Sequence, residues 1–281
     1  MLHGKPDKGR TRAAGAMTIL KRNNVNVSGQ GKRPIMFAHG FGCDQTMWRD
    51  VAPDFERDHK VILFDLTGAG QSDLTAYDFR RYSSLDGHAD DIVAIAEEMD
   101  LADTVLVGHS VSAITAALAS VKCPARFAAI VLVSPSPCFL NDDDYRGGFD
   151  RADLEEMIEF MEENYLGWAM QTAPAIAGQN SDEPSADKLT QSFCRTDPAI
   201  AQHFGRVTFT SDRREDMKSV SVPSLIIQCD NDAIAPVTVG EWMHAAMPGS
   251  VLQTVPVTGH CPHMTAPRIT IDAIRAFLAD H

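Results

Sequence analysis

The chain has 281 residues, of which 44% are hydrophobic and 22% are charged, so it is a globular protein long enough to bury a substantial core. Its formal net charge of -13 excludes nucleic acid and an anionic membrane surface as principal partners, because phosphates repel an acidic protein. The six cysteines form no CxxC pair and several lie near apolar runs, which indicates reduced thiols in a cytoplasmic protein.

The N-terminal segment is basic and polar and has no apolar stretch of the kind that signal peptides contain. Nothing later in the chain reaches transmembrane length. We therefore expect residues 1–23 to be a disordered leader in front of a soluble, cytoplasmic protein.

Apolar runs alternate with helical patterns through the first half of the chain. Strands are predicted over residues 24–28, 34–38, 61–65 and 129–133, and helices over residues 45–55 and 85–99, while residues 104–119 supply a further strand followed by a further helix. Residues 83–86 resemble a capping box in front of the second helix. Continuous apolar strands separated by helices indicate an α/β fold with a mostly parallel central sheet flanked by helices.

The strand pattern stops between residues 139 and 216, where only helical patterns occur, including one from Leu154 to Tyr165. Strands resume over residues 224–228 and 250–255, and a closing helix follows at 267–278. We therefore expect a core made of residues 24–138 and 217–281, interrupted by a helical lid at 139–216.

Residues 104–119 predict a strand, a sharp turn and a helix, with Ser110 at the apex of Gly108-His-Ser-Val-Ser112. Such a turn exposes the serine hydroxyl and directs backbone N–H groups at developing negative charge, as in a nucleophile elbow. Ser112 replaces the last glycine of that motif. The alternative is that Ser110 only caps the helix.

A second loop, His39-Gly-Phe-Gly42, follows the strand at 34–38. Together with the N–H of Val111, the backbone N–H of Phe41 is expected to form an oxyanion hole. His39 is expected to be hydrogen-bonded beneath this loop. Gly68 and Gly70 also follow a strand, but Asp73 stands where a dinucleotide-binding loop would carry its third glycine, so this segment is interpreted as a turn.

Asp232 and His260 also follow predicted strands, and the order Ser110, Asp232, His260 is that of an α/β-hydrolase. His260 is the expected base and Asp232 the residue that holds its tautomer. Asp230 and His263 are the rival positions. A metal site at residues 260–263 is not expected, because no second ligand cluster is present, and no cofactor is expected either.

Several motifs resemble RsbQ-type bacterial stress-signalling hydrolases and the plant karrikin and strigolactone receptors, and the resemblance runs from about Pro34 to the C-terminus. The motifs are residues 39–44, 64–73, 108–112, 140–142 with 147–149, 164–165 and 259–264. The resemblance implies an α/β-hydrolase fold with a four-helix lid. It also implies an apolar substrate pocket lined by Phe41, Phe139, Phe149, Trp168 and Phe193.

Two functions share these residues. One is a cofactor-free serine hydrolase that cleaves a small apolar ester or lactone through an acyl-enzyme. The other is a ligand-sensing signalling protein with slow or no turnover that acts through a regulatory protein partner. A catalytically inactive structural protein is the third alternative, and it predicts that a fluorophosphonate does not label Ser110.

Overall fold

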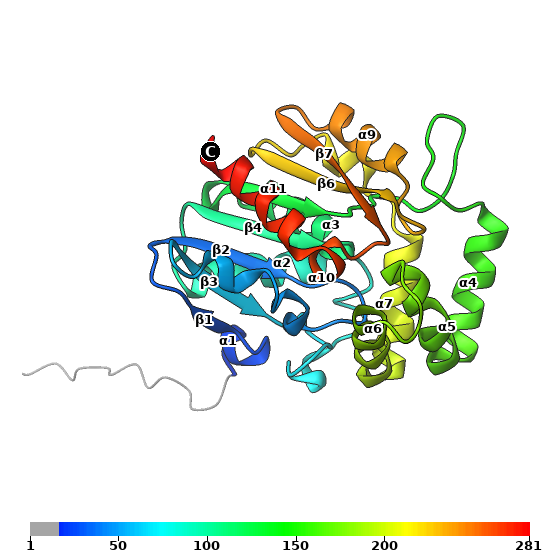
Figure 1. Cartoon of the computed structure of the whole chain (residues 1–281). Helices are drawn as coiled ribbons and strands as arrows, with labels where there is room; N and C mark the ends of the chain where they lie inside the picture. The colour runs from blue at the N-terminus through cyan, green and yellow to red at the C-terminus, as the bar shows by residue number, and fades with distance from the viewer. Residues whose placement is uncertain (1–16) are drawn as a thin grey trace, which may run out of the picture.

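The computed structural model describes residues 17–281, and its centre is one seven-stranded sheet in the order β1-β3-β2-β4-β5-β6-β7 (Figure 1). The strands are β1 (Asn26–Ser28), β2 (Arg33–Ala38), β3 (His59–Phe64), β4 (Thr104–His109), β5 (Phe127–Val133), β6 (Ser224–Asn231) and β7 (Ser250–Thr258). Only β1 pairs antiparallel, with β3, and every other pair is parallel. The predicted α/β fold with a mostly parallel sheet is therefore confirmed.

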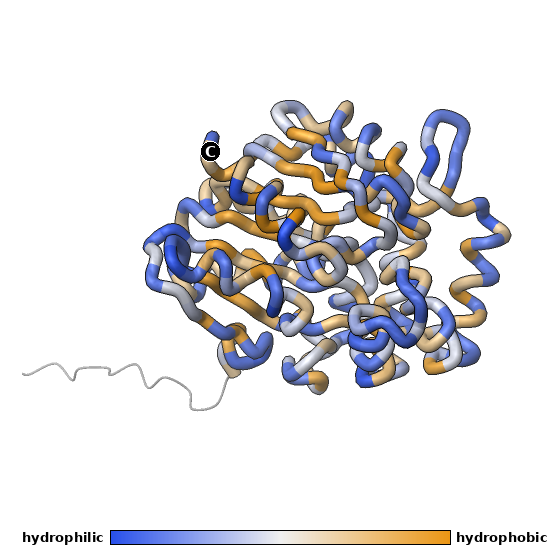
Figure 2. The backbone as a smooth tube through the Cα atoms, viewed as in Figure 1, coloured by the Kyte–Doolittle hydropathy of each residue, from blue (hydrophilic) through white to orange (hydrophobic). Residues whose placement is uncertain are grey.

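Helices cover both faces of this sheet, with α11 crossing one face and α2 and α3 lying on the other (Figure 1). The helices of the core are α1 (Ile19–Arg22), α2 (Asp86–Glu98), α3 (Val111–Lys122), α8 (Arg214–Met217), α9 (Val237–Ala246), α10 (Pro262–Thr265) and α11 (Pro267–Ala279). Strand β4 is buried along its whole length, because a parallel strand in the middle of such a sheet meets helices on both faces. Hydrophobic residues accordingly gather on the strands (Figure 2).

Four further helices lie between β5 and β6 in the sequence and gather at one end of the sheet, beyond the carboxyl ends of the strands (Figure 1). They are α4 (Arg151–Glu163), α5 (Tyr165–Ala177), α6 (Pro184–Arg195) and α7 (Pro198–Thr210), and we call them the four-helix segment. Arg206 of α7 forms two hydrogen bonds with the Glu162 carboxylate of α4, at 2.5 and 2.6 Å, which ties the first and last of these helices together.

Residues 45–55 differ from the single helix that the sequence predicts. They form two short 3₁₀ helices, Gln45–Trp48 and Ala52–Phe55. Pro53 explains why one α-helix does not run through both segments, because it is the second residue of the later helix and has no N–H to donate to the Arg49 carbonyl four residues earlier.

Helix boundaries differ from the predicted ones at two other places. Helix α2 begins at Asp86 after Leu85, and no side chain caps it, so the predicted capping box is wrong. The predicted helix from Leu154 to Tyr165 ends at Glu163, and α5 starts at Tyr165. Asn164 separates the two, since its side-chain oxygen accepts a hydrogen bond from the Gly167 N–H at 3.0 Å and caps the new helix.

The predicted leader also extends too far. Residues 1–16 lie outside the described residues, but Ile19–Arg22 form helix α1, capped by the side chain of Thr18. The next residue, Asn23, is fully buried and donates to the Asp65 carbonyl at 2.9 Å, which attaches this end of the chain to the loop after β3.

Candidate active site

Ser110 is the residue between β4 and α3, and its backbone is unusual. Its φ of 56° and ψ of −124° are strained for a residue with a side chain. Gly108 allows the chain to turn so tightly, because an ideal Cβ at that position would lie 2.2 Å from the Ser112 carbonyl oxygen. The Ser110 N–H donates to the Val133 carbonyl of the neighbouring strand at 2.9 Å, which fixes the turn at the carboxyl edge of the sheet.

His260 follows β7 and reaches the serine across the sheet edge. The distance from His260 Nε2 to Ser110 Oγ is 2.8 Å. The imidazole is buried, and the His260 backbone N–H donates to the Ile176 carbonyl of α5 at 2.7 Å. The four-helix segment therefore takes part in positioning this histidine.

Asp232 follows β6 and completes the arrangement, with its Oδ2 2.7 Å from His260 Nδ1. Its other oxygen, Oδ1, accepts the N–H groups of Ile234 and Ala235 at 2.8 and 3.1 Å. Burial alone raises the pKa of this carboxyl, but the imidazole and the two N–H groups outweigh burial and hold the pKa below its usual range. The carboxylate therefore accepts from Nδ1–H, which leaves Nε2 to accept the Ser110 proton.

The alternatives to these three residues do not have the same geometry. Ser110 stands before α3, but its side chain accepts no hydrogen bond from the helix, so it is not a cap. Asp230 is exposed. His263 is fully buried and lies between the rings of Trp48 and His109, at centroid distances of 4.6 and 4.3 Å. His39 accepts from the Leu66 N–H and donates to the Gly40 carbonyl, both at 2.9 Å, so it supports the loop as predicted.

The two N–H groups predicted for an oxyanion hole belong to segments that lie beside Ser110. An ideal Cβ at Gly40 would lie 3.5 Å from the Ser110 Cβ, which places the 40–42 loop next to the elbow. Val111 is the first residue of α3, where a helix leaves its N–H groups unpaired. Within residues 17–281, the N–H groups of Phe41 and Val111 donate to no protein acceptor.

A small, mostly apolar cavity lies against the serine and histidine. Its free volume is about 30 Å³, enough for about two water molecules at about 10–15 Å³ each. Its lining consists of Phe41, Cys43, His109, Ser110, Phe139, Ile176, Leu189, Phe193, Thr208, Phe209, Ile234, His260 and Cys261. Any group held here before the four-helix segment moves is therefore short.

Three of the five aromatic residues predicted for the pocket line this cavity: Phe41, Phe139 and Phe193. Trp168 does not, because it lies behind Phe193 and stacks on it at a centroid distance of 5.7 Å. Phe149 does not line it either, and its backbone instead pairs with Leu140. The sequence analysis missed Phe209, which packs edge-on against Phe139 at 5.1 Å.

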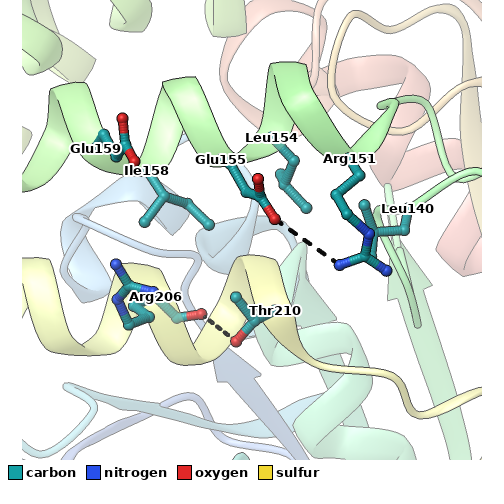
Figure 3. A pocket seen from close by; sticks show the side chains of 8 residues that line it. All are labelled: Leu140, Arg151, Leu154, Glu155, Ile158, Glu159, Arg206 and Thr210. Atoms are coloured by element: carbon teal, nitrogen blue, oxygen red, sulfur yellow. Dashed lines mark hydrogen bonds and ion pairs between the residues drawn. The ribbon is translucent and has the colours of Figure 1, made fainter.

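A larger hollow lies outside the cavity, between α4 and α7 (Figure 3). Its volume is about 370 Å³, and its lining is Leu140, Arg151, Leu154, Glu155, Ile158, Glu159, Arg206 and Thr210. It includes none of Ser110, His260 and Asp232, and its two arginines are balanced by two glutamates. Volume alone therefore does not identify the reactive site, and the side-chain chemistry favours the smaller cavity.

Between residues 17 and 281 no group of three or more His, Cys, Asp or Glu side chains is arranged to hold a metal ion. Among the same residues no helix is both long enough and apolar enough to cross a membrane.

A strained serine after a central strand is hydrogen-bonded to a histidine, which is in turn hydrogen-bonded to an aspartate, and both partners follow later strands. This arrangement defines the class of α/β proteins with a nucleophile elbow. The alpha/beta hydrolase family matches residues 35–273, and the chain belongs to this family.

Curated relatives cover almost the whole chain. A karrikin insensitive 2 receptor of Petunia hybrida is 38% identical over 257 residues, which are 91% of this chain and 95% of the relative. A strigolactone esterase of Pisum sativum is 40% identical over 252 residues, or 89% and 94% of the two chains. The predicted resemblance to karrikin and strigolactone receptors is thereby confirmed.

The structure of a hydrolase from Oleispira antarctica has the same fold, with a TM-score of 0.90 and 42% sequence identity. The match covers 94% of this chain and 97% of that hydrolase.

Proposed function

We propose that this protein is a serine esterase that cleaves a small, mostly apolar ester or lactone. The observation that carries the proposal is the continuous hydrogen-bonded path from Ser110 Oγ through His260 to Asp232, with links of 2.8 and 2.7 Å. Family membership and the esterase relatives support it.

The geometry supports a two-step reaction. His260 Nε2 takes the Ser110 proton as Oγ attacks the substrate carbonyl carbon, and the oxyanion that forms accepts from the N–H groups of Phe41 and Val111. His260 then protonates the leaving alkoxide, and an acyl group remains on Ser110. Water attacks this ester in the second step, with His260 as base, and the carboxylic acid leaves. Throughout, the Asp232 carboxylate stabilises the imidazolium.

The cavity supports a short acyl group over a long one. Free space of about 30 Å³ between aromatic and aliphatic side chains admits a few non-hydrogen atoms, and an acyl chain of ten carbons needs the four-helix segment to open. We infer that residues 139–216 act as a lid on the core formed by residues 24–138 and 217–281. The six free cysteines support a reducing compartment such as the cytoplasm.

One observation favours a second candidate function, which is ligand sensing. The His260 backbone N–H donates to α5 of the lid at 2.7 Å, so a change at the histidine during acylation is transmitted directly to a lid helix. A regulatory protein that binds only the altered lid would respond to this change. The relatives described as karrikin receptors support this alternative.

The esterase proposal is tested with p-nitrophenyl acetate, butanoate and decanoate. We expect hydrolysis of the two short esters, weak hydrolysis of the decanoate, and loss of activity in Ser110→Ala. Intact-mass analysis after fluorophosphonate treatment should show one adduct on the wild type and none on Ser110→Ala. An unlabelled, inactive wild type would contradict the proposal and leave the structural alternative.

Turnover number separates the two candidate functions. Many turnovers per protein molecule at a constant rate favour the esterase. A single fast release of p-nitrophenol followed by a stable acyl adduct, with a changed melting temperature, favours ligand sensing.

A further inference from the structure

His109 stands immediately before the nucleophile and contacts the Gly40 loop, the His260 loop and His263. Its Nε2 lies 2.8 Å from the backbone carbonyl oxygen of His260. A carbonyl only accepts, so Nε2 carries the proton and donates it. One imidazole therefore joins the serine, to which it is covalently adjacent, to the histidine from 150 residues further along the chain.

The ring of His109 is held from two other sides. An ideal Cβ at Gly40 would lie 2.5 Å from His109 Nδ1, so the ring occupies the space that the missing side chain of Gly40 leaves. His263, near the start of α10, also packs against the ring, with ring centroids 4.3 Å apart. The imidazole consequently contacts the 40–42 loop, the His260 loop and α10.

We propose that His109 is a positioning residue that fixes His260 relative to Ser110 by donating Nε2–H to the His260 carbonyl. This inference rests on the proposed function, since it assigns His109 a part in ester cleavage at the same site. Without this donor, the backbone of His260 keeps a single hydrogen bond within the described residues, from its N–H to the Ile176 carbonyl of α5.

His109 does not transfer protons in this proposal. Burial, with a smaller contribution from the nearby His260, lowers the pKa of His109 to about 3, so the ring stays neutral in the pH range where esterases work. Its one N–H is engaged by the His260 carbonyl. Its only remaining polar atom, Nδ1, has no hydrogen-bond partner in the described residues.

The test compares three substitutions at one position. His109→Phe keeps a planar ring and removes the donor. The amide N–H of glutamine reaches about as far from the backbone as Nε2, whereas that of asparagine reaches only about as far as Nδ1. We expect kcat for p-nitrophenyl acetate to fall about 100-fold in His109→Phe and His109→Asn, with KM within about twofold, and to recover at least tenfold in His109→Gln. Fluorophosphonate labelling of Ser110 should slow in parallel.

His88 provides the matched control. It is equally buried, stacks between Tyr82 and Phe204 at centroid distances of 4.5 and 4.6 Å, and forms no hydrogen bond in the described residues. His88→Phe therefore also removes a buried imidazole, but it leaves the Ser110–His260 pair intact. We expect its kcat to remain within about twofold of the wild type.

A second readout does not depend on turnover. The proton of His260 Nδ1–H bonded to Asp232 gives a low-field proton NMR resonance, which should shift or broaden in His109→Phe and return in His109→Gln. Unchanged kcat and resonance in His109→Phe, or a His109→Gln variant as impaired as His109→Phe, would overturn the proposal. If the wild type lacks esterase activity, the proposed function fails, and the resonance still decides whether His109 positions His260.

Discussion

Ser110 combines a reactive hydroxyl with a strained backbone. Its φ of 56° is disfavoured for every residue except glycine, and strain of this kind costs about 1–3 kcal/mol. The surrounding hydrogen bonds impose the conformation, including the one from the Ser110 N–H to the Val133 carbonyl. The nucleophile is thus exposed at the expense of stability.

We predict that Ser110→Gly unfolds at a higher urea concentration than Ser110→Ala, although both are inactive. Alanine keeps the Cβ and therefore the strain, whereas glycine relieves it, so the difference in free energy of unfolding should be about 1–2 kcal/mol in favour of glycine. Equal or reversed stabilities would mean that the backbone at Ser110 is relaxed.

Asp232→Asn should lower kcat for p-nitrophenyl acetate by about 10³- to 10⁴-fold. The amide holds the wrong imidazole tautomer and no longer stabilises the imidazolium, as at other Ser–His–Asp sites. Asp230→Asn is the matched control, since Asp230 is exposed near the end of β6, two residues before Asp232, and should keep near-normal kcat. Similar losses in both variants would point to damage to the loop rather than to a role of the Asp232 charge.

At the scale of residues, the sequence identifies the reactive side chains more reliably than it identifies the side chains that line the pocket. Ser110, Asp232 and His260 each follow an apolar strand, and parallel strands place their carboxyl ends at one edge of the sheet. The lining of the cavity depends on how each helix of the four-helix segment is rotated. Trp168 and Phe209 are both buried helical aromatics, but only Phe209 reaches the cavity, and no periodicity in the sequence distinguishes them.

The strands of the sheet could be predicted from the sequence, whereas the short 3₁₀ helices and the boundary between α4 and α5 could not. A strand in the middle of a parallel sheet is buried on both faces, as β4 is, so the apolar run of Val105, Leu106 and Val107 identifies it. The 3₁₀ helices at residues 45–55 carry apolar residues at helical spacing, but Pro53, which has no N–H, prevents them from joining into one α-helix. Asn164 likewise separates α4 from α5, and its capping role depends on the fold of the next turn.

Two elements meet closely where α5 ends and the His260 loop begins. Gly259 has a φ of 103°, and an ideal Cβ there would lie 2.3 Å from the Ala177 carbonyl oxygen. On the α5 side, an ideal Cβ at Gly178 would lie 2.5 Å from the Thr258 carbonyl oxygen. The two glycines therefore allow the lid helix and the histidine loop to touch through their backbones, and the hydrogen bond from His260 to Ile176 follows.

Gly259→Ala should reduce both stability and activity, because it adds a clash with α5 to the strain of a positive φ. We expect a loss of about 3 kcal/mol in the free energy of unfolding and at least a tenfold fall in kcat. Gly249→Ala isolates the strain, since Gly249 has a φ of 79° with nothing within 4 Å of an added Cβ, and should cost about 1 kcal/mol with normal kcat. Equal effects of the two substitutions would show that contact with α5 does not matter.

Across the whole molecule, several histidines are buried in neutral form. Burial lowers the pKa of His39, and it lowers the pKa of His88 to about 4 and that of His109 to about 3. It also holds the pKa of His263 well below its usual value of 6.5. The sequence predicts a position beneath a loop for His39, but it does not show that His88 and His263 are buried, because their burial depends on the packing of Trp48, Tyr82 and Phe204 around them.

These buried rings make the protein sensitive to acid. A histidine whose pKa is lower in the folded state than in the unfolded state favours folding fully above the unfolded pKa of about 6.5. Below that pH the histidine is protonated in the unfolded chain but not in the folded chain. The free energy of unfolding therefore falls with pH until the pKa of the histidine in the folded state is reached. Each such histidine removes about 1.36 kcal/mol per pH unit in this window.

We therefore predict that urea denaturation shows a steep loss of stability between pH 7 and pH 5. In His88→Phe, the loss in free energy of unfolding over this interval should be smaller by about 2 kcal/mol. His88 destabilises the wild type by about 1.36 kcal/mol for each pH unit between its unfolded-state pKa of about 6.5 and pH 5, and the variant lacks this contribution. The comparison cancels any constant effect of the substitution on packing, since only the difference between the two pH values is used. Parallel pH dependences of the wild type and His88→Phe would mean that His88 titrates normally in the folded protein, and that its ring is reached by water.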